Sequence, residues 1–255
     1  MKSLQHTISR TITIQADRET VFSFFTDPSK WAKWWGGGSR IDARPGGALE
    51  VHHSNGFVSE GNVLEIEQPE RIVFTFGLQT DPLTPPEDSR VTLELSEEDD
   101  GTVVRVVHAL ADPKVRDMME QGWRFHLSLF ANAVANEMYR DVEQRVDEWF
   151  AIWEEADPEI RAATIGRLAA PNVVFRDRYA CLDGAGEVLA QVAAVQRFMP
   201  GSGWARRGPV RHCQGVVLVN WEAREADGRA RGTGTSVFQF AFGKIVAVTG
   251  MADPS

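Results

Sequence analysis

The sequence predicts an α+β protein of two domains, and three observations lead to this fold class. The chain has 255 residues, and at about 150 residues per domain this length favours two small domains over one large one. Helical and strand-like periodicities both occur in each half. Residues 1–138 carry 13 Lys/Arg against 21 Asp/Glu, whereas residues 139–255 carry 14 against 15, so the halves differ in charge as separate units would.

The first half begins with a strand and a helix. Ile8, Ile12 and Ile14 share a parity, which predicts a half-buried strand over 7–15. Asp17 is expected to cap a helix that follows, because an aspartate side chain accepts hydrogen bonds from the first free backbone amides. Trp31, Trp34 and Trp35 come next at helical spacing, and strand-like alternation then continues to about residue 110. A further helix is expected from Asp112-Pro113.

The middle of the chain predicts a long helical stretch. Residues 123–156 contain neither Gly nor Pro, so this run is expected to stay helical almost throughout. The last helix of the first domain would then run into, or nearly abut, the first helix of the second, with a boundary near 138–142. We therefore assign the domains to 1–138 and 139–255, joined by a stiff connection.

The second half predicts two more helices and an antiparallel sheet. A helix is expected from Asp157-Pro158, and another over 184–199. The predicted strands are a short one over 172–179 and three longer ones over 209–222, 229–241 and 244–251.

Composition and charge exclude several classes of function. The net charge of −9 repels phosphate backbones, so no nucleic-acid partner is expected. No run of about 18 apolar residues occurs, so no membrane insertion is expected. The N-terminal residues hold no apolar segment of a secretion signal, which favours a cytoplasmic location with Cys181 and Cys213 as free thiols.

The motifs of the first half resemble a known superfamily. They are VFSFFTDPSKWAKWW (21–35), ARPGG (43–47), GNVLEIEQPERIVFTF (61–76), GTVVRVVHALADP (101–113) and GW (122–123). Together they resemble the START-like, helix-grip superfamily (SRPBCC), in the branch named after the activator of the heat-shock-protein ATPase. The resemblance implies an antiparallel sheet around a long C-terminal helix, with an apolar cavity between them for a small hydrophobic ligand.

A mostly aromatic set of residues is expected to supply the wall of that cavity. Gly122 would leave room on the gripping helix. The expected wall residues are Trp35, Phe57, Phe74, Phe76, Met118, Gly122, Trp123 and His126. No metal site is expected among the histidines, because the adjacent His52 and His53 point to opposite faces of a strand. Nucleotide-binding motifs do not occur, so no cofactor is expected.

The motifs of the second half resemble the nuclear transport factor 2-like cone fold, in its SnoaL-like branch. They are WFAIWEEADPEIRAATIGRLAAPNVVFRD (149–177), LDGAGEVLAQVAAVQ (182–196), GPVRHCQGVVLVNWEA (208–223) and GKIVAVTG (243–250). The resemblance implies a cone-shaped α+β barrel closed by helices. Its members include isomerases, dehydratases, cyclases and non-catalytic proteins. Such domains commonly pair sheet to sheet, so a homodimer is one expected arrangement.

Within the cone domain, Asp177 is the principal candidate for chemistry. The resemblance puts it where related isomerases hold a general-base carboxylate, although it could equally be a surface acid paired with Arg176 or Arg178. The same resemblance puts Trp149 and Ser236 at the oxyanion positions, where neither is a tuned acid, so steroid-isomerase chemistry is disfavoured. His212 could assist Asp177 in moving a proton, or it could be a surface or core histidine whose hydrogen bonds are satisfied.

Three functions follow from these residues and resemblances. The leading expectation is binding of a small hydrophobic molecule, whether lipid-like, aromatic or polyketide-like, in apolar cavities. The second is a cofactor-free cyclase, isomerase or dehydratase that uses Asp177 with His212, and the third is an interaction protein that regulates a chaperone. Whether the protein is an enzyme stays open at this point. The expected ligand contacts of the second domain are Trp149, Trp153, Phe175, Tyr179, Trp221 and Ser236.

Overall fold

The computed structural model describes residues 3–78, 81, 83–99 and 101–254. The chain divides into two compact units, Met1–Val134 and Ala135–Ser255. Each unit is built on a seven-stranded sheet with helices packed against it, so the predicted α+β class is confirmed. In the described part of the chain, no helix is both long and apolar enough to cross a membrane.

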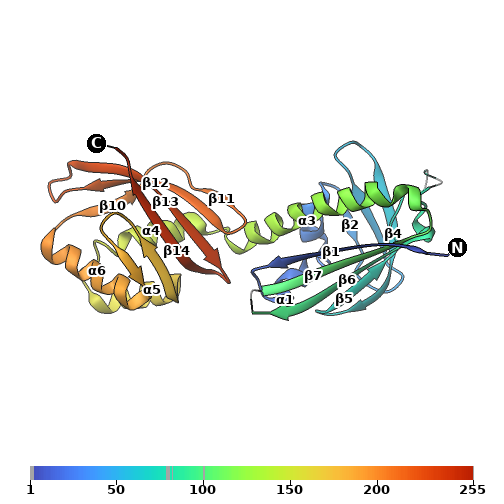
Figure 1. The fold of residues 1–255 in the computed structure, drawn as a ribbon, viewed down its shortest axis with the longest axis horizontal. Helices are drawn as coiled ribbons and strands as arrows, with labels where there is room; N and C mark the ends of the chain where they lie inside the picture. Colours follow the sequence, from blue (N-terminus) through green and yellow to red (C-terminus); the bar gives the residue numbers. More distant parts are fainter. Residues whose placement is uncertain (1–2, 79–80, 82, 100, 255) are drawn as a thin grey trace. The chain divides into compact units, whose positions relative to one another are not determined.

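The sheet of the first unit is antiparallel throughout and has the order β1-β7-β6-β5-β4-β3-β2 (Figure 1). Its strands are β1 (His6–Ile14), β2 (Arg40–Ile41), β3 (Ala48–His52), β4 (Val58–Glu67), β5 (Arg71–Phe74), β6 (Ser89–Glu98) and β7 (Gly101–Leu110). Burial alternates along β6 and β7, which is the pattern of strands with one face in a core.

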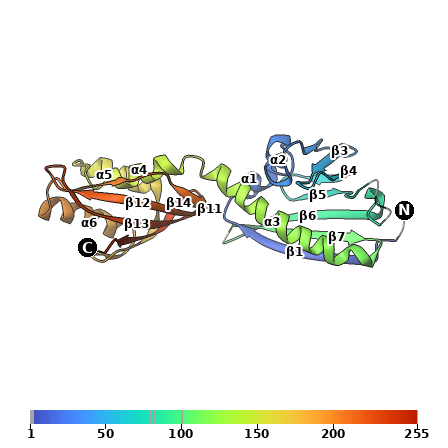
Figure 2. The ribbon, with the colours of Figure 1, turned by 90° about the horizontal axis from the view of Figure 1, so that it is seen from above.

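The first two helices of the first unit begin at aspartate caps, and the helices pack through aromatic side chains. They are α1 (Arg18–Ser23), α2 (Pro28–Trp35) and α3 (Arg116–Met138), with single 3₁₀ turns η1 (Pro86–Asp88) and η2 (Pro113–Val115). The Asp17 carboxylate accepts the Thr20 amide, as expected. Helix α3 lies along the sheet (Figure 2), and its Phe130 stacks on Phe25 with ring centroids 4.9 Å apart.

The long helix predicted over 123–156 is interrupted. Helix α3 ends at Met138, and helix α4 (Val142–Ala151) begins after a three-residue turn. In this turn Tyr139 is buried, with its ring 5.2 Å from Phe240. The Asp141 carboxylate accepts the Arg145 Nε–H instead of capping α4. Burial of the Tyr139 ring therefore outweighs the helical propensity of the run.

The second unit has a mixed, open sheet, with the order β10-β12-β13-β14-β8-β9 and β11 paired to β12. Its elements are α5 (Pro158–Leu168), β8 (Ala169–Arg176), β9 (Cys181–Asp183), α6 (Ala185–Phe198), β10 (Gly203–Arg206), β11 (Arg211–Cys213), β12 (Val216–Arg224), β13 (Ala230–Ala241) and β14 (Lys244–Ala252). Strands β14 and β8 run parallel, and the other pairs run antiparallel. In the described residues the sheet does not close, so the expected barrel is an open sheet.

One predicted strand is in fact two. Residues 209–222 contain β11 and β12, which fold back on each other so that His212 pairs with Val217. The reversal is made at Gln214 and Gly215, whose φ angles are 47° and 81°. Backbone at positive φ suits a tight hairpin turn. Apolar residues lie on both sides of this turn in the sequence, and for this reason the sequence predicts one continuous strand.

Candidate functional site

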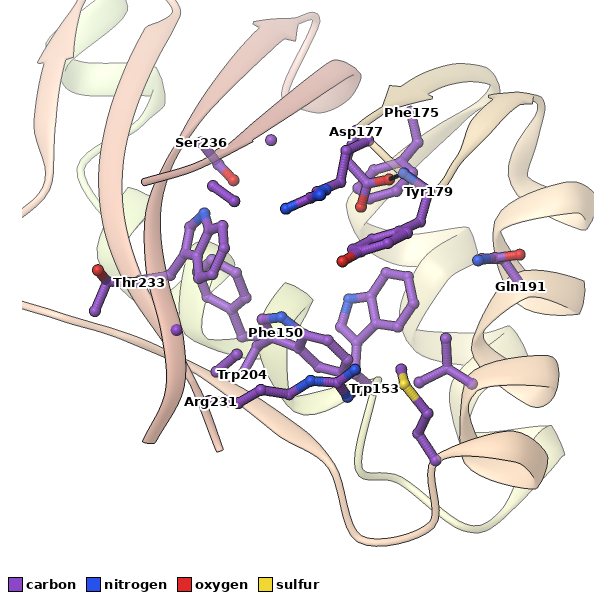
Figure 3. A pocket seen from close by; sticks show the side chains of 18 of the residues that line it. Phe150, Trp153, Phe175, Asp177, Tyr179, Gln191, Trp204, Arg231, Thr233 and Ser236 are labelled. Carbon is purple, nitrogen blue, oxygen red and sulfur yellow. Dashed lines mark hydrogen bonds between the residues drawn. The ribbon is translucent and has the colours of Figure 1, made fainter. Parts of the chain in front are cut away.

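The second unit contains a cavity of ≈ 660 Å³ (Figure 3). Helix α4, the turn after β8, the end of α6 and strands β10, β12, β13 and β14 all contribute to its wall. Eight of the lining side chains are aromatic: Trp149, Phe150, Trp153, Phe175, Tyr179, Phe198, Trp204 and Trp221. A concave site with this lining is typical of one that binds a small apolar molecule.

The aromatic lining runs from the core of the unit to the solvent. Trp149 is 1% exposed, whereas Tyr179 and Phe198 at the other extreme are 74% and 75% exposed. Trp153 connects neighbouring parts of the wall, with its ring centroid 5.8 Å from Phe175 and 5.5 Å from Trp204. A ligand would therefore be held on rings that are already packed, and two exposed rings stand at the rim.

One wall of the cavity depends on a glycine in β13. A Cβ at Gly234 would lie 2.2 Å from Cζ2 of Trp221, closer than atoms can approach. Only glycine therefore lets the Trp221 indole lie across β13. The indole supplies a broad apolar surface at this position, and it lines the cavity.

Asp177, Gly250 and Ser236 lie in a row across three adjacent strands. Gly250 of β14 pairs with Ser236 of β13, and Asp177 directly follows the last residue of β8. A Cβ at Gly250 would lie 3.4 Å from Asp177 Cβ and 3.5 Å from Ser236 Oγ. Glycine thus leaves a slot between a carboxylate and a hydroxyl that both line the cavity.

A tight turn fixes the Asp177 carboxylate. Its Oδ1 accepts the Tyr179 amide at 2.7 Å, and its own amide donates to Ala180 O at 2.9 Å. Among the described residues no other hydrogen bond or ion pair engages this carboxylate. Arg176 is bound to Asp183, and the Arg178 guanidinium lies 5.1 Å from the Tyr179 ring. The alternative in which Asp177 is neutralised by Arg176 or Arg178 is therefore not what the structure contains.

His212 lies outside the cavity lining, so the structure does not bring it together with Asp177. Its Nδ1 lies 3.2 Å from Asn136 Oδ1, and its Nε2 accepts the Gly215 amide at 3.0 Å. Burial lowers the pKa of His212. The interpretation of His212 as an assistant of Asp177 fails because the turn at Gln214 and Gly215 puts it on the short strand β11.

In the first unit, four of the expected ligand contacts pack on one another. Trp35, Phe74, Phe76 and Trp123 are all buried. The Trp35 ring lies 5.5 Å from Phe76 and 5.7 Å from Trp123. Phe57 and Met118 are 59% and 54% exposed, so these two lie mainly in solvent.

Gly122 and His126 complete the expected set on α3. A Cβ at Gly122 would meet no atom within 4 Å, so there is space beside this position. His126 lies 4.4 Å from the Trp35 ring, and burial lowers its pKa to about 4. Among the described residues no three His, Cys, Asp or Glu side chains are grouped as metal ligands would be.

A buried polar network in the first unit escaped the sequence analysis. Ser89 Oγ donates to Phe76 O at 2.6 Å and lies 2.8 Å from His108 Nε2, while Trp123 Nε1 donates to His108 Nδ1 at 3.0 Å. These contacts assign the neutral imidazole with its proton on Nε2. Burial lowers the pKa of His108 to about 4, so the imidazole is neutral at pH 7. The hydrogen bonds of His108 connect α3 to the sheet and therefore stabilise the fold of the first unit.

The cavity also includes residues that the sequence analysis missed, among them Phe150, Trp204, Arg231 and Gly250. Trp204 lies on β10, a strand that was not predicted. Arg231 and Gly250 lie near the ends of predicted strands, where one charged residue or one glycine gives no signal of a site by itself.

Comparison with known proteins defines the class of the first unit, which has the antiparallel sheet and long helix of an SRPBCC-type domain. Residues 15–135 match the family model described as "Activator of Hsp90 ATPase homolog 1-like protein". This match occupies nearly all of the first unit, which is therefore a domain of that family. No curated protein matches the chain.

Three solved structures are similar to parts of the chain. A candidate isomerase of the SnoaL-like family from Agrobacterium tumefaciens is 24% identical, covers 44% of this chain and 96% of its own, and has a TM-score of 0.42. CalU16 from Micromonospora echinospora is 28% identical over 57% and 86% of the two chains, with a TM-score of 0.43. The Aha1 dimer from Colwellia psychrerythraea is 16% identical over 48% and 91%, with a TM-score of 0.43.

Proposed function

We propose that the protein binds a small hydrophobic molecule, largely aromatic in character, in the cavity of its second unit. The observation that carries this proposal is the grouping of four tryptophans, Trp149, Trp153, Trp204 and Trp221, around one space of ≈ 660 Å³. Aromatic rings bury large apolar areas and stack on other rings, so they favour planar apolar ligands. The two exposed rings at the rim, Tyr179 and Phe198, extend the same surface outward.

A fluorescent probe tests this proposal directly. The uncharged dye N-phenyl-1-naphthylamine brightens in apolar surroundings, and its affinity can be titrated against the intact protein. We expect Trp221→Ala to weaken binding by about tenfold, because the indole supplies the surface above Gly234. Phe242→Ala is the control, because Phe242 is an exposed aromatic residue of the second unit that lies outside the cavity lining.

The proposal fails if the dye does not bind, or if Trp221→Ala binds it as the unchanged protein does. Thermal unfolding of both variants shows whether a loss of binding reflects a loss of fold. The conservative variant Trp221→Phe keeps an aromatic ring, and we expect it to bind more tightly than Trp221→Ala.

We propose proton abstraction next to a carbonyl group as the second candidate function, because Gly250 leaves room between Asp177 and Ser236. A ligand carbonyl in that slot could accept the Ser236 hydroxyl hydrogen bond. Asp177 would take a proton from the adjacent carbon, and the electron pair of the C–H bond would pass to the carbonyl oxygen as an enolate. Return of the proton at the same or another carbon completes an exchange or an isomerisation, and His212 has no part in this step.

Deuterium exchange tests the second candidate. The probe is 2-tetralone, an enolisable aromatic ketone, whose incorporation of deuterium from D₂O is followed by NMR. We expect Asp177→Asn to reduce the protein-dependent exchange at least about a hundredfold, with an unchanged melting temperature. The amide oxygen of Asn can still accept the Tyr179 amide.

Asp253→Asn is the matched control, because Asp253 also lines the cavity and is held by Thr233 Oγ1 at 2.6 Å. Equal exchange rates in both variants and in the unchanged protein would show that Asp177 has no catalytic role. The binding proposal would not be affected by that result.

A further inference from the structure

The cavity of the second unit has two chemically different ends. Asp177 and Ser236 lie at one end and Arg231 at the other, with Trp153 and Phe150 between them (Figure 3). Ser236 and Arg231 are five residues apart on β13. At about 3.3 Å per residue, the strand separates their Cα atoms by roughly 16 Å. We therefore expect a ligand that contacts both ends to be elongated.

The guanidinium of Arg231 has no anion beside it. Among the described residues no carboxylate lies within 4.0 Å of it, and its NH1 instead lies 2.8 Å from Met199 Sδ. Arg229, two residues earlier in the chain, is by contrast bound to both Asp227 and Glu225. A thioether is a weak acceptor and Arg231 is exposed, so most of its N–H donors face solvent and are available to a ligand.

We infer that the ligand is amphipathic, with an anionic group held by Arg231, an aromatic body along the tryptophans and a polar group in the slot at Gly250. This inference rests on the proposed binding function and adds the chemical class of the ligand to it. The planar guanidinium presents paired N–H donors that match the two oxygens of a carboxylate or sulfonate. Arg231 would thereby set the direction in which the ligand lies, so that its other end meets Asp177 and Ser236.

Arg178 also lines the cavity but is less suited to this role. Its guanidinium lies on the Tyr179 ring at 5.1 Å, and its neighbour in the chain is the carboxylate of Asp177. An anion bound at Arg178 would lie close to that carboxylate and be repelled by it. Arg231 lies at the other end of the cavity from Asp177, so the repulsion by that carboxylate is smaller there. The carboxylates of Asp227 and Glu225, which line a hollow together with Arg231, are already bound to Arg229.

Two probes that differ in one group test the inference. 8-Anilinonaphthalene-1-sulfonate is N-phenyl-1-naphthylamine with an added sulfonate, so the ratio of the two affinities measures recognition of the anion. We expect Arg231→Gln to weaken binding of the sulfonated probe about tenfold or more and to leave the neutral probe unchanged. Arg211→Gln is the control, because Arg211 is exposed in the same unit, has no ion pair among the described residues and lies outside the lining.

The outcomes separate this inference from the function on which it rests. If Trp221→Ala weakens both probes but Arg231→Gln weakens neither or both equally, the cavity binds ligands and the anion site is wrong. If Arg178→Gln alone lowers the affinity of the sulfonated probe, the anion lies at the other end and the inference is overturned. If Trp221→Ala leaves both probes unaffected, the binding proposal fails together with the inference.

Discussion

Gly250 determines how much space is left between Asp177 and Ser236 in the cavity wall. A methyl group there would make ordinary van der Waals contacts with Asp177 Cβ at 3.4 Å and Ser236 Oγ at 3.5 Å. The substitution Gly250→Ala is therefore compatible with the fold. It would nevertheless fill the slot between the carboxylate and the hydroxyl.

We expect Gly250→Ala to abolish exchange of 2-tetralone while leaving the melting temperature close to that of the unchanged protein. The affinity for N-phenyl-1-naphthylamine should change little, because that dye has no carbonyl group to place in the slot. Unchanged exchange in Gly250→Ala would show that the reaction, if present, takes place elsewhere. NMR exchange rates and a thermal melt are sufficient measurements.

Some residues of the cavity could be predicted from the sequence, and others could not. Seven expected residues of the second unit, Asp177 and six proposed ligand contacts, do line one cavity. Asp177, Trp149 and Ser236 could be named because the resemblance to the SnoaL-like branch implies a position for each, and the others are aromatic residues within or next to the motifs that carry this resemblance. Arg231 could not be named, because the role proposed for it depends on which of the described side chains lie near it in space.

At the scale of elements, turns account for the main errors. The strand predicted over 209–222 is divided at Gln214 and Gly215, and this division moved His212 away from the cavity. A glutamine at positive φ is uncommon, so the sequence carried little warning of the turn. The turn after Met138, by contrast, falls where the two helices were expected to abut, near 138–142, and there Tyr139 is buried in the core of the second unit.

His108, whose hydrogen bonds join α3 to the sheet, should make the first unit less stable in acid. The pKa of His108 is about 4 in the folded protein and near 6.5 when the chain is unfolded. The unfolded chain therefore binds a proton first as pH falls. The stability due to neutral His108 is complete above about pH 6.5 and is lost as pH falls towards 4, on the order of 3 kcal/mol.

We expect His108→Gln to reduce this loss. Glutamine offers an N–H to Ser89 and a carbonyl oxygen to Trp123, and it does not titrate. Urea unfolding of the intact protein at pH 7 and pH 4.5 gives the free energies. If the unchanged protein and the variant lose the same free energy between these pH values, His108 does not carry the acid sensitivity.

At the scale of the whole molecule, the chain joins two units with separate cores and different interiors. The first unit packs Trp35, Phe76 and Trp123 on one another, whereas the second leaves a large aromatic cavity. The α+β class could be predicted because strand alternation and helical spacing are local properties of the sequence. The volume left between packed side chains is not local, and it depends on how bulky rings such as Trp221 lie against glycines.

The tryptophans give the most direct test of where a ligand binds. The chain has eight, of which Trp31, Trp34, Trp35 and Trp123 belong to the first unit and Trp149, Trp153, Trp204 and Trp221 line the cavity of the second. Labelling tryptophan with ¹⁵N gives one indole N–H signal for each, and single substitutions assign them. On addition of N-phenyl-1-naphthylamine we expect the four cavity signals to shift and the other four to stay in place. Shifts confined to the first unit, or no shifts at all, would contradict the proposal that the second unit holds the ligand.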